Sequence, residues 1–466
     1  MPDHDAAREE FLQQLREAQR SLDAGFAHLP PAPQTALDDR AAAILQEAAT
    51  RLRDNDPYGH PLYAGQMLKP PHPIARAAYA LAMSINPNNH ALDGGRASSA
   101  MEIEAVAEIA KMFGWDEHLG HLASGGTFAN LEALWIAGQL AREQNRPLGI
   151  AASDQAHYTH ARISCVLGLP FVSIASGSDG QMNLRALEGE LQKGTVGTVV
   201  ATLGTTATGA VDPLDRIIAL GERYNFRLHV DAAYGGYFIL AANAGNPLAF
   251  RALPDPRIDS IVVDPHKHGL QPYGCGCVLF RDPTAGRFYK HDSPYTYFTS
   301  RDLHLGEISL ECSRAGASAV ALWATQKLLP YTRGGEFARG LEAGCEAARS
   351  FYEQINFRGP FVGTMIRPAL DIVCWTVRGR TPEESSARAE AIFKEARRRD
   401  LYLALAKLPV RYFPWEMWDK RAVSEANAMH PTYVTCLRSV LMKPDHREWL
   451  PEIISRLDAA VTAVIG

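Results

Sequence analysis

The stretch "IDSIVVDPHKHGLQPYGCG", residues 258–276, places one lysine between two histidines, directly after an apolar run and before a glycine-rich turn. The run at 258–264 is short and rich in β-branched residues, so it predicts a buried strand. Lys267 then follows the carboxyl end of that strand. Ligands of open α/β sheets bind at this edge, so Lys267 is a candidate for chemistry. The alternative is a solvated lysine in a surface loop.

Length and composition indicate a globular protein of more than one domain. The chain has 466 residues, of which 46% are hydrophobic and 21% charged. Its net charge of −5 gives no basic stripe, and no run approaches the roughly 20 apolar residues of a membrane span, so we expect neither nucleic-acid nor membrane partners. The charged N-terminus lacks a signal-peptide core. The missing signal-peptide core and the seven scattered cysteines together indicate a cytoplasmic protein.

Three regions follow one another along the chain. Residues 1–59 predict an arm of two helices split by "HLPPAPQ", which we interpret as a packing or dimerisation arm. Residues 60–335 alternate apolar strands with helices, as in a mostly parallel sheet covered by helices. Residues 336–466 predict a smaller α+β domain with strands at "DIVCWTV" and "YVTCLRSVLM". The strands predicted for the large domain are "LGIAAS", "FVSIAS", "GTVVATLG", "RLHVDAA", "DSIVVD" and "GCVLF".

A glycine turn leads into one predicted helix, in "ASGGTFANLEALW" at 123–135. The turn consists of small residues, Ser124, Gly125, Gly126 and Thr127, so its backbone could approach a phosphate closely. The N-terminus of the following helix would favour the negative charge of that phosphate. The alternative is a turn that only caps the helix. The turn matches neither the P-loop nor the GxGxxG pattern.

Further candidate site residues follow predicted strands. The ring of His157 in "DQAHYTHAR" could stack on an aromatic cofactor, or it could be a satisfied structural histidine. Thr205, in "TLGTTATGAVDPL", could line a pocket. Asp231 ends an apolar strand, where a carboxylate needs a cationic partner. Lys267 could be that partner in a plain salt bridge. Alternatively, Lys267 forms a Schiff base with an aldehyde cofactor, and Asp231 keeps the cofactor's ring nitrogen protonated.

The cysteines do not indicate a metal site. Cys275 and Cys277 form a CxC, but no second pair lies at zinc-like spacing. Alternating small residues in a strand explain "GCGCVLF". We therefore expect no bound metal.

Together these motifs resemble fold-type-I enzymes that use pyridoxal 5′-phosphate (PLP), and among them the group II amino-acid decarboxylases that act on aromatic amino acids, tyrosine or glutamate. The order and spacing of His157, Asp231 and Lys267 match that family. The resemblance implies an aspartate aminotransferase-like α/β fold, with a large mostly parallel sheet and a small C-terminal domain. It also implies a homodimer with its active site at the subunit interface. The likeness extends over "HPLYAG", "SSAMEIEAVAEIAKMFGW", "GTTATGAVDP", "VDAAYGG", "DPHKHG" and "ECSRAGASAVALWA".

The resemblance assigns roles at the cofactor. Lys267 would carry PLP, His157 would cover one ring face, Ala233 would pack against the other, and Asp231 would bind the pyridine nitrogen. The cofactor-binding candidates thus comprise Ser124, Gly125, Gly126, Thr127, His157, Thr205, Asp231, Ala233, His266 and Lys267. Many relatives have serine where this chain has Asp264. An anion would repel the phosphate, so we expect Asp264 to face elsewhere.

The resemblance also suggests residues for the substrate. Tyr295 and Tyr297 lie where the family has a mobile loop whose tyrosine is the proton donor, and the sequence does not choose between them. Arg438 matches a position that binds the substrate carboxylate, with a surface salt bridge to Asp445 or Glu448 as the alternative. Tyr63 is a further substrate-side candidate. Arg314 matches a motif with a partly structural role.

The function implied is α-decarboxylation of an L-amino acid to its amine and carbon dioxide. Tyr63 and Phe128 slightly favour an aromatic substrate such as tyrosine over an acidic one, whereas Asn88, Asn89 and His90 would suit a polar end. The alternatives are a carbon–carbon lyase of the sphingosine-phosphate-lyase type, an aldehyde synthase that couples decarboxylation to oxidative deamination, and a non-catalytic PLP protein. The lyases usually carry a membrane anchor, and a non-catalytic protein should have lost the lysine, the aspartate or the loop tyrosine.

Overall fold

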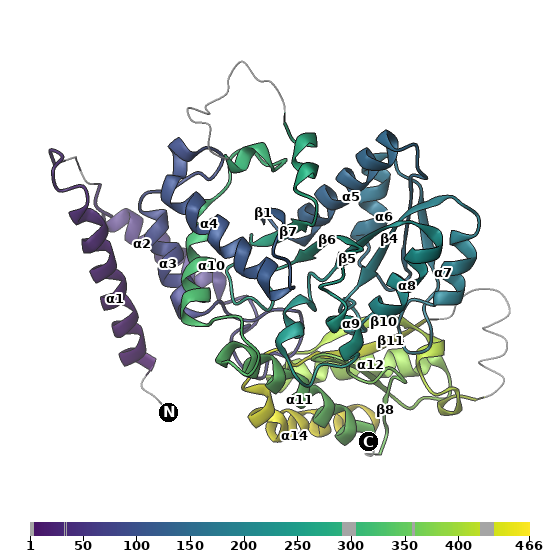
Figure 1. The fold of residues 1–466 in the computed structure, drawn as a ribbon. Helices are drawn as coiled ribbons and strands as arrows, with labels where there is room; N and C mark the ends of the chain where they lie inside the picture. The colour runs from purple at the N-terminus through teal and green to yellow at the C-terminus, as the bar shows by residue number, and fades with distance from the viewer. Residues whose placement is uncertain (1–3, 32, 34, 291–303, 357–358, 420–432) are drawn as a thin grey trace.

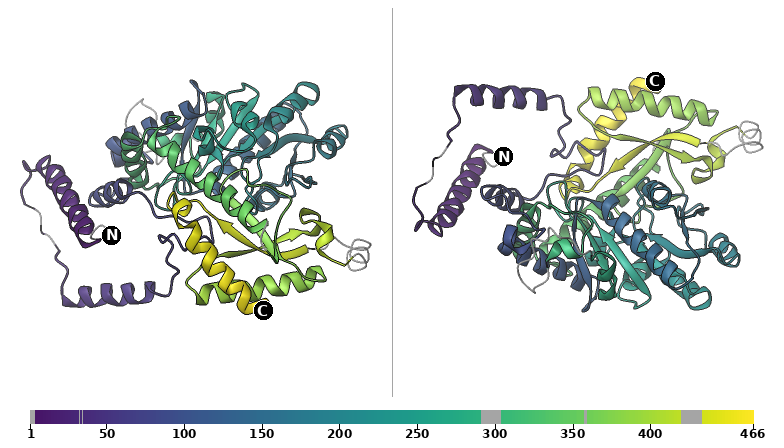
Figure 2. Two further views of the ribbon diagram at one scale, coloured as in Figure 1. Left: turned by 90° about the horizontal axis from the view of Figure 1, so that it is seen from below. Right: turned by 90° about the horizontal axis from the view of Figure 1, so that it is seen from above.

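The computed structural model describes residues 4–31, 33, 35–290, 304–356, 359–419 and 433–466 (Figure 1). Two helices, α1 (His4–Ala24) and α2 (Asp39–Leu52), flank the segment "HLPPAPQ". They lie beside the body of the protein rather than within it, as Figure 2 shows. No residue of α2 is buried, so the arm gains little from packing within a single chain.

The large domain is built on a seven-stranded sheet, counted over the described residues, with the order β1-β7-β6-β5-β4-β2-β3. Strands β2 to β6 that neighbour one another run parallel, whereas β7 is antiparallel to both β6 and β1. This mostly parallel α/β sheet confirms the predicted fold class. The strands are β1 (Leu119–Ala123), β2 (Gly149–Ser153), β3 (Phe171–Ile174), β4 (Val196–Thr202), β5 (Arg227–Asp231), β6 (Ile258–Val263) and β7 (Gly276–Phe280).

Helices cover this sheet, which is why its central strands read as unbroken apolar runs. Every residue of β2 and β4 is buried. The helices are α3 (Pro73–Met83), α4 (Leu92–Met112), α5 (Gly126–Glu143), α6 (Thr159–Leu167), α7 (Leu184–Leu191), α8 (Leu214–Tyr224), α9 (Pro247–Arg251) and α10 (Gly316–Leu328). Short 3₁₀ helices span Gly236–Leu240, Pro283–Phe288 and Leu305–Glu307.

The small domain contains an antiparallel sheet, four-stranded over the described residues, with the order β10-β11-β9-β8. The predicted strands at 371–377 and 433–442 are present as β9 (Ile372–Val377) and β11 (Tyr433–Val440). The other two strands are β8 (Phe361–Gly363) and β10 (Ala404–Pro409). The helices are α11 (Glu336–Asn356), α12 (Pro382–Arg398) and α14 (His446–Ile465), with 3₁₀ turns at Val410–Tyr412 and Trp415–Met417.

Three strand ends and one helix start meet at one edge of the large sheet. Thr202 ends β4, Asp231 ends β5, and Lys267 follows β6 by four residues. Gly126 begins α5 directly after the turn that leaves β1. The fold thereby brings together residues that are up to 141 positions apart in the sequence. Over the described residues, the protein has no helix whose length and apolar character would let it cross a lipid bilayer.

Candidate active site

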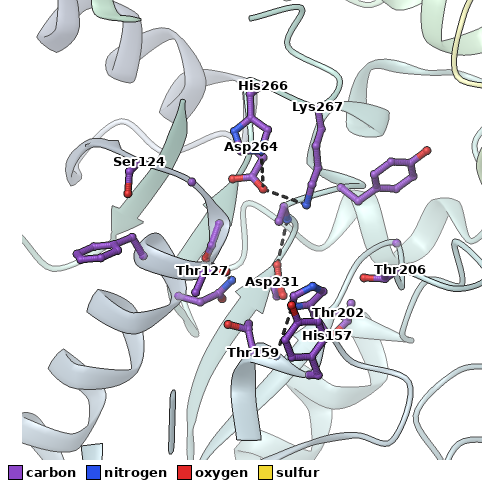
Figure 3. A pocket seen from close by; sticks show the side chains of 18 of the residues that line it. Ser124, Thr127, His157, Thr159, Thr202, Thr206, Asp231, Asp264, His266 and Lys267 are labelled. Carbon is purple, nitrogen blue, oxygen red and sulfur yellow. Dashed lines mark hydrogen bonds and ion pairs between the residues drawn. The ribbon is translucent and has the colours of Figure 1, made fainter. Parts of the chain in front are cut away.

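A cavity of about 420 Å³ opens at this edge of the sheet (Figure 3). It collects most of the predicted cofactor residues from segments that are distant in sequence. Tyr295 and Tyr297 lie outside the described residues. The predicted residues that line the cavity are Ser124, Gly125, Gly126, Thr127, His157, Asp231, Ala233, His266 and Lys267.

The partner of Lys267 is Asp264, whose Oδ2 lies 2.9 Å from Nζ. The expectation that Asp264 faces elsewhere is therefore wrong, since this carboxylate lines the cavity. The reason is the turn after β6, in which the Lys267 backbone N–H donates to the Asp264 carbonyl oxygen at 2.9 Å. Such a turn sets both side chains on one side of the loop. The plain salt bridge between Lys267 and Asp231 is not among the ion pairs of the described residues.

Asp231 is held by His160 instead. Nε2 of His160 lies 2.8 Å from Oδ2, and Oδ1 accepts the Ala233 N–H at 3.1 Å. Burial alone would raise the pKa of Asp231, but the His160 hydrogen bond and the charges of His160 and Lys267 outweigh it and hold that pKa well below its usual range. The carboxylate therefore stays ionised at the floor of the cavity. His160 was not predicted; its one signal was a position three residues after His157.

His157 lies beside Asp231 in the cavity (Figure 3). Its Nδ1 accepts the Thr159 N–H at 3.3 Å, which leaves Nε2 to carry the proton of a neutral ring. Burial lowers the pKa of His157, and the Lys267 charge lowers it further against the opposing effect of Asp231. The ring is thus uncharged at neutral pH and suited to cover a flat aromatic group.

The glycine turn forms a cradle at the start of α5. Gly125 has φ +154°, and no side chain caps the helix, so its first N–H groups stay available. A Cβ on Gly126 would lie 2.6 Å from Asp264 Oδ2, and one on Gly125 would lie 3.3 Å from the His266 ring. A side chain at either position would crowd Asp264 or His266, and the positive φ of Gly125 also favours glycine. The helix N-terminus favours an anion.

His266 is oriented by the strand beside it. Its Nδ1 bonds to the Cys275 carbonyl oxygen at 2.7 Å, so Nδ1 carries the proton. Burial lowers the pKa of His266 despite the opposing charge of Asp264. Tyr273, which was not predicted, also lines the cavity, with its ring centroid 4.9 Å from that of His266.

Six of the predicted residues that the structure describes are not part of the cavity lining. Thr205 is fully buried and bonds to Thr208 at 2.9 Å, while its neighbour Thr206 faces the cavity. Arg438 and Tyr63 are buried behind the wall. The predicted pocket residue Phe128 lines the cavity, whereas Asn88, Asn89 and His90 do not.

Arg438 nevertheless touches the wall of the cavity. Its Nη1 donates to the Thr206 carbonyl oxygen at 3.0 Å and its Nη2 to Gln66 Oε1 at 3.1 Å. Its Nε has no hydrogen-bond partner among the described residues. Arg438 forms no ion pair with Asp445 or Glu448 there, so the surface salt bridge is not observed. Arg314 instead pairs with a buried glutamate, Glu102, at 2.6 Å, as suits a structural role.

Taken together, the cavity fits a phosphorylated heteroaromatic aldehyde. It offers the Lys267 amine for attachment and the ionised Asp231 for a protonated ring nitrogen. The neutral ring of His157 can cover a planar group, and the glycine cradle can take a phosphate. PLP has each of these features.

Comparisons with known proteins agree with this fit. Residues 32–378 match the family model described as "Pyridoxal-dependent decarboxylase conserved domain". The chain is 31% identical over 422 residues to L-tyrosine decarboxylase from Enterococcus faecium, covering 68% of each protein. It is 29% identical over 335 residues to L-aspartate decarboxylase from Thermococcus kodakarensis, covering 71% of this chain and 83% of that protein.

Solved structures of low sequence identity share the fold. The crystal structure of Oryza sativa TDC with PLP and tryptamine aligns with a TM-score of 0.77 at 17% identity, over 100% of both chains. Mouse CSAD in its apo form aligns with a TM-score of 0.75 at 20% identity, over 98% of this chain and 99% of the other.

Proposed function

Because the chain belongs to the pyridoxal-dependent decarboxylase family and is a PLP-dependent amino-acid decarboxylase, we propose that its substrate is an aromatic L-amino acid, with tyrosine favoured over aspartate. One observation carries this choice. The rings of Phe128 and Tyr273 are exposed on the cavity wall, and the described part of that wall has no arginine for a second carboxylate. The products are the amine and carbon dioxide.

The chain's own residues divide the work at the cofactor. When bound, PLP supplies an aldehyde for attachment and a ring that accepts the electron pair left by departing carbon dioxide. Lys267 is the proposed point of attachment, with Asp264 as its counter-ion. Asp231 keeps a proton on the ring nitrogen through a charge-assisted hydrogen bond, worth about 1.5–3 kcal/mol in typical cases. His157 and Ala233 would cover the two ring faces, and the glycine cradle with His266 would hold the phosphate.

We assign Arg438 to the substrate carboxylate. The Arg438 guanidinium is buried behind Thr206, and its Nε–H has no hydrogen-bond partner among the described residues. This donor could therefore bind an anion. Arg438→Met should raise KM for the amino acid about tenfold or more while leaving cofactor binding intact. Steady-state kinetics together with a PLP titration check this. An unchanged KM would remove Arg438 from the site.

The proposed assembly is a homodimer. The arm supports it, because α2 exposes Ile44, Leu45 and Leu52 and buries none of its residues within one chain. In the proposed dimer the partner subunit covers this face and completes the active site. Analytical ultracentrifugation tests the assembly, and a monomer at micromolar concentration would contradict it.

Carbon-dioxide release from the PLP-loaded protein is the deciding experiment. Each common L-amino acid is supplied in turn, and products are identified by mass spectrometry. Release with tyramine from tyrosine supports the proposal, and release from aspartate alone would overturn the substrate assignment. An aldehyde product would indicate the synthase alternative, in which Tyr295 and Tyr297 would be the next residues to test. No release from any amino acid would favour the lyase alternative.

Lys267→Ala is the matched variant for this assay. It should lose the visible absorbance of the lysine-bound cofactor and reduce turnover by about 10³-fold or more. Lys193→Ala is the control, because Lys193 is exposed and its one ion pair among the described residues is with Glu190. Retained turnover in Lys267→Ala would overturn the mechanism.

A further inference from the structure

A further cavity, of about 470 Å³, lies between the large domain, the start of α11 and the segment that precedes α14. Its lining comes from residues 69–73, His268 and Leu270, the start of α11 and residues 443–445, together with Gly59 and Leu329. None of these residues lines the active-site cavity. The mechanism proposed above makes no use of this cavity.

Lys443 provides a buried cation in this lining. Its side chain is only 3% exposed, and Nζ donates to the Tyr63 carbonyl oxygen at 2.6 Å. Among the described residues, no carboxylate lies within ion-pair distance, 4.0 Å, of this ammonium group. Burial lowers the pKa of Lys443 to about 7, and the charge of Lys69 contributes to that shift. The nearby Asp445 carboxylate opposes the shift, so the group feels a negative charge but forms no ion pair among the described residues.

Lys69 and His268 lie in the same lining. Lys69 is half-buried and has no hydrogen bond or ion pair among the described residues, and burial lowers its pKa to about 8. His268 is 1% exposed, and its Nδ1 is without a partner among those residues. Asp371 lies 3.2 Å from the other ring nitrogen but also accepts the Tyr234 hydroxyl at 2.6 Å, and it does not line the cavity. Three basic side chains that form few hydrogen bonds among the described residues thus gather in this lining.

The remaining lining is apolar, with a mixed charged rim. Pro70, Leu270, Phe337 and Leu341 form apolar wall. The charged residues Glu336, Arg339 and Asp445 are exposed, so they lie at the solvent side of the cavity. An occupant that matches this distribution has its negative charge at Lys443 and an apolar body along the wall. The volume falls within the usual range for a small-molecule site, about 300–1,000 Å³.

We propose that this cavity binds a small organic anion, with a carboxylate head at Lys69 and Lys443 and an apolar body, at a site separate from the active site. The anion supplies a direct ion-pair partner, which neither lysine has among the described residues although Asp371 and Asp445 lie near enough to affect their pKa values, and its head can accept hydrogen bonds from both lysines. The proposal does not depend on which amino acid the enzyme decarboxylates.

Isothermal titration calorimetry on the PLP-loaded protein tests this, with 4-phenylbutyrate as the probe and 4-phenylbutanol as its uncharged counterpart. We expect saturable binding of one acid per chain, and at least about tenfold weaker binding of the alcohol. Lys69→Met and Lys443→Met should each weaken binding of the acid about tenfold and leave the alcohol nearly unchanged. Lys193→Met, at an exposed ion pair, should bind like the wild type.

Equal affinity for acid and alcohol would overturn the proposal, and so would unchanged binding in Lys69→Met. Arg438→Met tests whether the acid binds at the active site instead. If Arg438→Met weakens binding of the acid and Lys69→Met does not, the proposal is contradicted. Because Lys69 is half-buried and free of hydrogen bonds, its variant should fold even if the buried Lys443→Met does not. A failure of the carbon-dioxide assay would leave these binding outcomes unaffected.

Discussion

Two buried histidine–carboxylate pairs in the described part of the large domain have nearly the same length. His160 and Asp231 are 2.8 Å apart, and His121 and Glu132 are 2.9 Å apart. Both histidine rings are fully buried. The pairs differ in what surrounds them, since Asp231 lines the active-site cavity and Glu132 does not. His121 also bonds through Nδ1 to the Leu122 carbonyl oxygen at 2.7 Å, whereas Nδ1 of His160 has no partner among the described residues.

The difference teaches that the pairing itself does not specify a catalytic role. Glu132 lies within α5 and is enclosed by protein on every side, so its pair can serve only the core. Asp231 stands at the carboxyl end of a parallel strand, where the sheet leaves space for a ligand. Position at the sheet edge therefore turns a buried ion pair into a binding group.

The largest expected effect comes from replacing the two carboxylates. Asp231→Asn should lower kcat by roughly 10²-fold, because an amide cannot keep a proton on the cofactor's ring nitrogen through a charge-assisted bond. Glu132→Gln should leave kcat within about twofold and reduce thermal stability instead, since it breaks a buried pair. Turnover of the PLP-saturated variants and their melting temperatures check both. If Asp231→Asn and Glu132→Gln lowered kcat equally, the two histidine–carboxylate pairs would not differ in their role in catalysis.

Replacing the histidines should give a smaller, pH-dependent effect. His160 lowers the pKa of Asp231, so His160→Leu raises that pKa, and the carboxylate becomes protonated at a higher pH. We expect roughly tenfold lower kcat, with the acid limb of the pH–rate profile moved upward. His160→Gln, which keeps a donor, should restore part of the loss.

His121→Leu is the matched control for that experiment. It should destabilise the protein without moving the pH–rate profile, because Glu132 does not reach the cavity. A shift of the acid limb in His121→Leu, or none in His160→Leu, would show that His160 does not act through Asp231.

The smallest expected effect concerns Lys443, a buried lysine that forms no ion pair among the described residues. Its pKa is lowered to about 7 from the ordinary 10.5, so between these pH values the unfolded chain binds more protons than the folded one. Stability should therefore rise with pH through this window. Lys443→Met should flatten that rise relative to the wild type. Urea unfolding at pH 7 and at pH 9 checks the difference, and parallel curves would contradict the lowered pKa.

Much of the architecture could be predicted from apolar patterning. The central parallel strands are buried on both faces, so their sequences are short unbroken apolar runs between glycines and polar residues. Strand β1 was not predicted because "LGHLA" contains a glycine and a histidine, which weaken the apolar pattern. Strand β8 was not predicted because it is only three residues long. Strand β10 alternates exposed with partly buried positions and ends in a proline, which gives a weak strand signal.

The site was predictable only in part. Three site residues could be predicted because the order and spacing of their motifs match the decarboxylase family: Lys267, Asp231 and His157. His160 and Gln66 act through single contacts with residues far away in sequence, and such contacts leave no local pattern. Asp264 was misjudged, because its charge was weighed against an expected phosphate and not against the lysine three residues later.

By itself, the sequence determined that the central strands are buried and which reactive groups follow them, because periodicity and residue type are local properties. Only the tertiary structure decided which charge neutralises which. Asp264 pairs with Lys267 because a backbone turn brings the two side chains together. His160 pairs with Asp231 because α6 packs close to the end of β5. Electrostatic pairing depends on distances of a few ångströms between chain segments. Those distances follow from packing, which no single stretch of sequence contains.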